Sequence, residues 1–244
     1  MAVPIYQDSG VYAATDATST LNVYFPATVN SGDILLLRVL IARNATFSAL
    51  LGWTLESQGT ASNQVGVVLY SKRANGSETG YVTVEADLTF LMVGRIDRYS
   101  GCVATGAYIE GLDTNIGYSD NDVIVPDLVT TGAERLAVLI IALEDNVAPT
   151  SYPAGWNEVY NVQDTTGDDS SLVLCTQNAP NNDTLTGGVA EVPFSDYYGC
   201  FVLALIPASG EDALTAQNIL AGAVAISQPT LGHIHITGCL ELFI

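Results

Sequence analysis

Positively charged side chains are scarce in this 244-residue sequence. Seven lysines and arginines stand against 26 aspartates and glutamates, which gives a formal net charge of −19, and no basic residue follows Arg135. Such a surface repels phosphate backbones and anionic lipid headgroups, because binding to either depends on a stripe of cations. The sequence therefore argues against nucleic acid and membrane surfaces as partners.

Long apolar runs and secretion signals are also lacking. LAVLIIAL, one of the longest apolar runs, begins at residue 136, whereas a membrane-spanning helix needs ~20 such residues. The N-terminus has neither the basic region nor the apolar region of a signal peptide. We therefore expect a soluble protein that is made in the cytoplasm.

Cysteine and histidine are rare, and catalytic motifs are missing. None of the four cysteines forms a C-x-x-C pair, and we expect all of them to be reduced and mostly buried: Cys102, Cys175, Cys200 and Cys239. Serine and cysteine nucleophiles normally use a histidine base, and both histidines lie near the C-terminus. Phosphate-binding loops, dinucleotide-binding motifs and zinc-protease motifs are absent. We expect no catalytic residue and no cofactor, although paired carboxylates for sugar hydrolysis stay an open alternative.

An internal duplication organises the sequence. Each of the two tryptophans follows a glycine, in GWTLESQG (52–59) and in GWNEVYNV (155–162). Three further pairs of blocks align in the same order: 22–42 with 122–142, 67–79 with 172–184, and a last pair that ends at Gly101 and Gly210. We predict that matched strands occupy equivalent places in the fold.

Each half carries the patterns of β-strands. ILLLRVLIA (34–42) and LAVLIIAL are apolar runs typical of buried strands, and VGVVLYSKR (65–73) partly alternates, as half-exposed strands do. Asn75-Gly76, which follows it, is typical of a tight hairpin turn. The sequence predicts an all-β fold, a β-sandwich or jelly roll built from two pseudo-equivalent halves. One jelly roll is favoured over two stacked sandwiches, because each half alone has few strands to close a core.

The expected organisation has four parts: an N-terminal arm (1–17), two halves (18–109 and 118–209) and a C-terminal tail (210–244). The tail has no counterpart in the repeat, and after Glu211 it carries only Asp212 and Glu241 as charged residues. An apolar segment of that kind is unfavourable in water. We therefore expect it to pack on the sandwich or on another subunit of a homo-oligomer, with a trimer favoured.

Several motifs resemble those of a known family. GWTL (52–55), VVLYSKRA (67–74), SETGYVTV (77–84) and IDRYSG (96–101) together resemble a β-sandwich family of tailed-bacteriophage virion proteins and some bacterial surface proteins. The tail segment LTAQNILAGAVAISQPTLGHIHI (214–236) resembles C-terminal segments of phage structural proteins. The second half departs from Gly-Trp-Thr at Asn157, so it is recognised by register more than by motif.

This resemblance implies a structural or adhesive role. We expect a non-enzymatic protein on the virion surface, a capsid decoration or head fibre, which is assembled in the host cytoplasm and contacts other virion proteins. A tail-fibre or baseplate component is one alternative. A carbohydrate-binding adhesin that binds a host-surface glycan is another.

Two groups of residues are weak candidates for metal ligands. Asp164, Asp168 and Asp169 supply hard oxygen atoms suited to calcium, although their spacing is not that of an EF-hand and an acidic loop is usually only solvated. His233 and His235 would lie on one face of a strand. In a trimer their six imidazoles could meet on an axial metal, as in the phage spike and fibre tips that the tail resembles; the alternative is a solvated strand.

Four aromatic residues are candidates for stacking against a glycan: Trp53, Trp156, Tyr118 and Tyr160. Both tryptophans recur at the same position of the repeat. That recurrence is also what packing in the core or at a sheet edge predicts, and we favour core packing for both.

Overall fold

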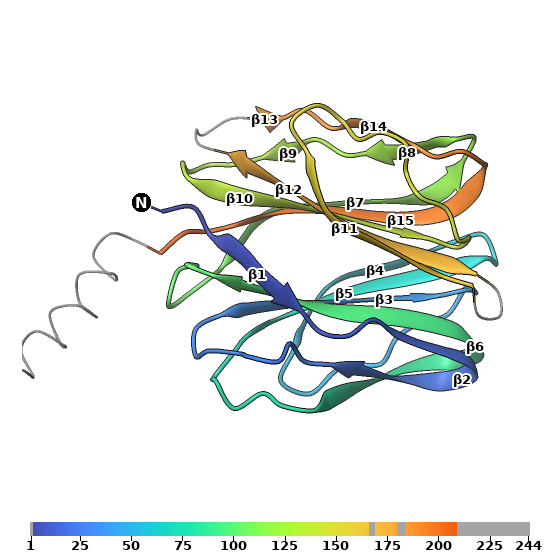
Figure 1. Ribbon diagram of the computed structural model, residues 1–244, viewed down its shortest axis with the longest axis horizontal. Helices are drawn as coiled ribbons and strands as arrows, with labels where there is room; N and C mark the ends of the chain where they lie inside the picture. Colours follow the sequence, from blue (N-terminus) through green and yellow to red (C-terminus); the bar gives the residue numbers. More distant parts are fainter. Residues whose placement is uncertain (1, 166–168, 180–183, 209–244) are drawn as a thin grey trace, which may run out of the picture. The chain divides into compact units, whose positions relative to one another are not determined.

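The computed structural model describes residues 2–165, 169–179 and 184–208, and these fold into antiparallel β-sheets (Figure 1). The prediction of an all-β sandwich is confirmed. The predicted C-terminal tail at 210–244, with His233, His235 and Cys239, lies outside the described residues.

The first sheet is built from the first half of the chain. It contains β1 (Ile5–Ser9), β2 (Ala13–Tyr24), β3 (Ile34–Ile41), β4 (Thr54–Ala61), β5 (Val65–Arg73) and β6 (Tyr81–Ser100). Its order is β1-β6-β3-β5-β4, and β2 also pairs with β6. The first 17 residues, expected as an arm outside the sandwich, contribute β1 and the start of β2 to this sheet.

The second sheet is built from the second half. It contains β7 (Ile109–Ser119), β10 (Arg135–Leu143), β11 (Asn157–Asp164), β12 (Ser170–Ala179) and β15 (Asp196–Leu205), in the order β11-β12-β10-β15-β7. Two short ribbons complete this half: β8 (Asp122–Val125) with β14 (Gly188–Glu191), and β9 (Leu128–Val129) with β13 (Thr184–Leu185).

The matched central strands occupy equivalent places, which confirms the prediction from the duplication. In the first sheet β3 lies between β5 and β6, and in the second sheet β10 lies between β12 and β15. The edge strands β4 and β11, which follow the two Gly-Trp pairs, are equivalent as well. Each is interrupted by a β-bulge at the same point, at Glu56 in β4 and at Val159 in β11.

The strand pairing corrects the alignment of the two halves. The residue after each tryptophan gives a common starting point for comparing the two sheets. In the first half Thr54 pairs with Ser71, which pairs with Leu36. In the second half Asn157 pairs with Thr176, which pairs with Val138. Leu36 therefore corresponds to Val138, two residues beyond the Leu136 of the sequence alignment. By the same register Tyr99 corresponds to Leu205, so the match that ended at Gly101 and Gly210 placed the last strand on the wrong face.

Three apolar clusters form the core. The central one lies between the two sheets and includes Leu36, Leu40, Val138 and Phe201. A second cluster lies on the outer face of the second sheet, under the β8–β14 and β9–β13 ribbons, and a third lies on the outer face of the first sheet, under β2 and the start of β6 (Figure 1). No main sheet mixes strands of both halves, so the arrangement is that of two stacked halves rather than the single intertwined jelly roll favoured from the sequence. Each half also closes an outer core of its own, in addition to the central cluster that both share.

The hairpin turn predicted at Asn75-Gly76 is wrong. The strands on either side of it, β5 and β6, are separated in the sheet by β3, so the intervening segment is a crossing loop. Gly76 does adopt a positive φ of 86°. The Glu78 carboxylate accepts hydrogen bonds from the backbone N–H groups of Asn75 (3.0 Å) and Gly76 (2.9 Å), which stabilises this loop without a tight turn.

Candidate functional site

The two tryptophans belong to the outer cores. Trp156 is 8% exposed and lies in the cluster beneath the β8–β14 ribbon. Trp53 is half-buried; its ring stacks on Phe25 with centroids 6.2 Å apart, and the Lys72 Nζ lies 5.9 Å from its centroid. Both positions favour the core-packing interpretation over glycan stacking.

The two candidate tyrosines are in different surroundings. Tyr118 is 54% exposed and lies against Tyr197, with centroids 4.9 Å apart. Tyr160 is half-buried at the junction of the halves, where its hydroxyl donates a hydrogen bond of 2.7 Å to Asp97 Oδ1. Tyr118 is thus the one candidate of the four whose ring is largely open to a ligand.

A buried charged network surrounds Tyr160. Arg38 and Asp97 form an ion pair between β3 and β6, and their side chains are 1% and 0% exposed. Ser9 donates a further hydrogen bond of 2.6 Å to Asp97. The guanidinium of Arg95 lies 4.0 Å from the centroid of the Tyr160 ring. This network joins the first half to the second, and a single arginine inside the apolar run ILLLRVLI was its only sequence signal.

The second half has no such network at the matching positions. By the register above, Arg38 corresponds to Ile140 and Asp97 corresponds to Leu203, and both of these residues lie in the central core. The two inner faces therefore differ in polarity although their strands match.

All seven basic side chains lie in the described part of the chain, and each is engaged within it. Four form ion pairs: Arg38–Asp97, Lys72–Glu78 (3.0 Å), Arg98–Asp33 (3.1 Å) and Arg135–Glu110 (2.7 Å). Three lie over aromatic rings: Arg43 over Phe90 (4.2 Å), Arg73 over Tyr108 (4.9 Å) and Arg95 over Tyr160 (4.0 Å). No basic side chain is left to form a cationic patch.

The metal candidates are only partly described. Asp164 ends β11 and Asp169 directly precedes β12, whereas Asp168 lies outside the described residues. Across residues 2–165, 169–179 and 184–208, no three histidine, cysteine, aspartate or glutamate side chains gather as a metal site.

The described thiols are free and buried, as predicted for Cys102, Cys175 and Cys200. Burial raises the pKa of Cys102 and of Cys175 to about 12, and it raises the pKa of Cys200 as well. The thiolate is the reactive form of cysteine. These three side chains are therefore protonated and unreactive at neutral pH.

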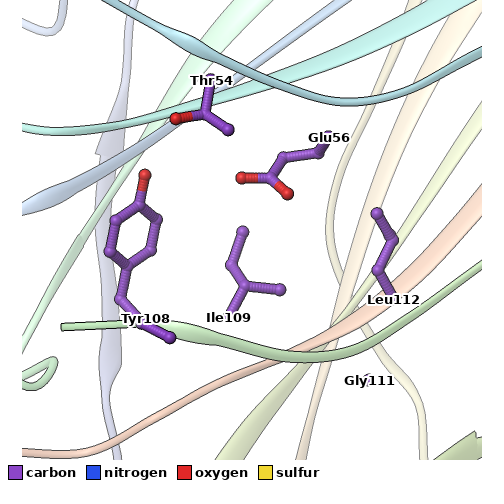
Figure 2. Close-up of a pocket in the computed structure, with 7 residues that line it drawn as sticks. Thr54, Glu56, Tyr108, Ile109, Gly111 and Leu112 are labelled. Atoms are coloured by element: carbon purple, nitrogen blue, oxygen red, sulfur yellow. The ribbon is translucent and has the colours of Figure 1, made fainter.

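A pocket of about 390 Å³ lies where the edge strand β4 meets the start of β7 (Figure 2). It is lined by Thr54, Glu56, Ala107, Tyr108, Ile109, Gly111 and Leu112. The Glu56 carboxylate accepts a hydrogen bond from Ser71, and the Ser71 hydroxyl lies 2.7 Å from the Tyr108 hydroxyl. The pocket thus has a polar side, formed by Thr54, Glu56 and Tyr108, which is faced by Ile109 and Leu112.

A second pocket of about 530 Å³ occupies the matching seam, where β1 meets the second half. Val159 stands there at the bulge position that Glu56 holds in β4, and Pro4, Ile5 and Leu136 add further apolar lining. The two seams therefore carry related pockets, with a carboxylate at the bulge in the first and an apolar side chain at the bulge in the second. Sequence reasoning missed Glu56, because nothing in TLES distinguishes its carboxylate from the other acidic side chains.

No protein-family model matches the chain, and neither does any curated protein or solved structure. A search of the described residues for a helix long and apolar enough to cross a membrane finds none. The resemblance to phage virion proteins therefore rests on the sequence motifs alone.

Proposed function

We propose that the protein is a non-enzymatic structural protein of a tailed-phage virion, carried on the particle surface as a capsid decoration or head fibre. The observation that carries the proposal is the internal use of every basic side chain. With a net charge of −19 and every basic side chain engaged within the fold, the protein is repelled by packaged DNA. Its place in a particle is then the outside.

The described body also supports a structural role through its chemistry. The three buried thiols are unreactive, and each half closes around its own core. Packed β-sheets with apolar cores on both faces suit a part that has to persist rather than turn over.

Exposed aromatic side chains offer contacts to neighbouring subunits. Tyr24 on β2 and Tyr81 on β6 are cross-strand partners, 45% and 53% exposed, with ring centroids 5.7 Å apart. Tyrosine is enriched at protein interfaces, where it combines an apolar ring with a polar tip. This pair supports contact with other subunits or other virion proteins, and the trimer favoured from the sequence is part of the proposal.

Immunogold labelling of purified particles tests the proposal. Antibody raised against the full chain is expected to decorate the head surface of intact particles. Gold confined to the tail would instead support the tail-fibre or baseplate alternative. Absence of label from both intact and opened particles would overturn a virion role.

A carbohydrate-binding adhesin is the second candidate function. It is favoured by one specific observation, the polar pocket between β4 and β7. The tryptophans do not favour it, because they are engaged in the outer cores.

A further inference from the structure

We propose that the pocket between β4 and the start of β7 binds a neutral sugar ring. Glu56 and the hydroxyls of Thr54 and Tyr108 would pair with the sugar hydroxyls. This inference is independent of the proposed virion role, which stands or falls by labelling of particles.

The lining groups suit the chemistry of a sugar. An ionised carboxylate offers about four acceptor positions, and tyrosine and threonine hydroxyls both donate and accept. A sugar ring presents a rim of hydroxyls and faces of C–H groups, so it needs a polar side and an apolar side. Glu56 points into the pocket from one side, and Ile109 and Leu112 border it from the other (Figure 2). Its volume of about 390 Å³ lies within the range of small-molecule sites.

The polar side of the pocket is fixed before any ligand arrives. Ser71 is fully buried, and its hydroxyl contacts both Glu56 and the Tyr108 hydroxyl. The Arg73 guanidinium lies 4.9 Å from the centroid of the Tyr108 ring, and its Nη2 donates a hydrogen bond of 3.2 Å to the carbonyl of Gly106. A rigid site loses less conformational entropy on binding.

The apolar side is shaped by a residue that has to be glycine. Gly111 has a φ of 59°, and a Cβ at this position would lie 2.6 Å from the carbonyl oxygen of Val129. It stands where β7 bulges away from β15, between Glu110 and Asp113. The bulge carries Leu112 along the border of the pocket.

Charge selects the class of sugar. Glu56 is the one charged side chain that lines the pocket, and it forms none of the ion pairs of the described residues, so the lining itself carries a negative charge. Acidic sugars and phosphorylated sugars are repelled by it. Neutral sugars are not, and their hydroxyls donate to the carboxylate in charge-assisted hydrogen bonds.

The second seam provides a matched control. Val159 takes the place of Glu56 at the equivalent bulge, in a pocket lined mainly by apolar residues. A Val159→Thr change alters this related pocket while the carboxylate of the first is kept. Any loss of sugar binding in this variant would measure the general effect of a substitution at an edge-strand bulge, separate from the loss of the carboxylate.

Saturation-transfer NMR on the full chain tests the proposal. The probes are glucose, galactose, mannose and N-acetylglucosamine as neutral sugars, with glucuronic acid and N-acetylneuraminic acid as acidic ones. We expect at least one neutral sugar to bind with a millimolar Kd and neither acid to bind. Glu56→Gln should weaken binding of the neutral sugar about tenfold, because the sugar hydroxyls then donate to a neutral oxygen instead of a charged one. Tyr108→Phe should also weaken it, and Val159→Thr should leave it unchanged.

Three results would overturn the proposal. The first is no transfer to any neutral sugar from a protein that melts cooperatively. The second is equal affinity in the Glu56→Gln variant and the parent chain. The third is stronger binding of n-butylamine than of any sugar, lost in Glu56→Gln, which would identify the pocket as a site for an alkyl ammonium group.

Discussion

Arg38 and Tyr160 come from different halves of the duplication, and the Arg38 guanidinium lies 5.1 Å from the centroid of the Tyr160 ring. Asp97 connects them, because it pairs with Arg38 and accepts a hydrogen bond from the Tyr160 hydroxyl. The junction between the sheets is therefore held by directional polar contacts in addition to the central apolar cluster.

Removing one charge of this pair should be strongly destabilising. Asp97→Ala leaves Arg38 buried without its partner, and we expect a loss of about 3–5 kcal/mol in the free energy of unfolding. Urea denaturation of the full chain measures it. The double variant R38I/D97L copies the residues that the second half uses at these places, and it should recover most of the loss. A double variant no more stable than Asp97→Ala would show that the pair cannot be replaced by apolar packing.

Asp196 should make stability fall as the pH rises. Burial raises its pKa to about 7, although the backbone N–H of Asp145 donates a hydrogen bond of 3.1 Å to its Oδ2. An unfolded aspartate titrates near pH 3.9, so the folded chain holds this proton more tightly. The stabilisation is fully present below about pH 4 and is lost as the pH rises through about 7.

The Asp196→Asn variant tests this pH dependence. It keeps a side-chain acceptor for the Asp145 N–H without the ionisation. We expect the difference in unfolding free energy between variant and parent to move in the variant's favour by about 1 kcal/mol per pH unit across the window. Denaturation curves taken at steps from pH 4 to 8 measure that difference. A constant difference would mean that Asp196 does not titrate in this range.

The purified protein should not bind DNA. A gel-shift experiment at ~0.1 M salt is expected to show free duplex only, since seven basic side chains against 26 acidic ones leave no net positive charge to displace counterions from DNA. A retarded band that disappears as salt is increased would contradict the proposal that the protein lies on the particle exterior.

The C-terminal tail is predicted from its sequence to hold subunits together. A chain truncated after Ala208 should have a smaller oligomeric mass by light scattering than the full chain. Burial of even half of so apolar a segment is expected to contribute several kcal/mol per subunit at ~25 cal/mol per Å². An unchanged oligomeric state would show that the tail does not hold the subunits together.

The duplication and the main strands could be read from the sequence, because apolar runs and glycine-flanked tryptophans are local signals. The residue-by-residue match between β3 and β10 could not be read from the sequence. A strand repeats every two residues, so sliding ILLLRVLI by two keeps the same faces buried, and only pairing with β5 and β6 fixes the match. Gly76 has the backbone conformation that a turn needs, but the order of strands, a non-local property, decided whether a hairpin forms there.

The candidate site could not be predicted from the sequence, for a similar reason. Glu56 and Tyr108 are distant along the chain, and they meet only because β4 lies against the start of β7. The two tryptophans are candidate glycan contacts by residue type, yet they pack in the outer cores. Long-range packing, rather than residue type, determines which polar side chains reach the surface together.

Joining the two halves in one polypeptide has an evolutionary consequence. In a symmetric dimer every substitution appears twice, so a charge placed at one seam is also placed at the other. In this chain Glu56 could arise opposite Val159, and Arg38 opposite Ile140, each without its mirror copy. Covalent fusion thus lets the two seams diverge, with a carboxylate at the bulge of one and an apolar side chain at the bulge of the other.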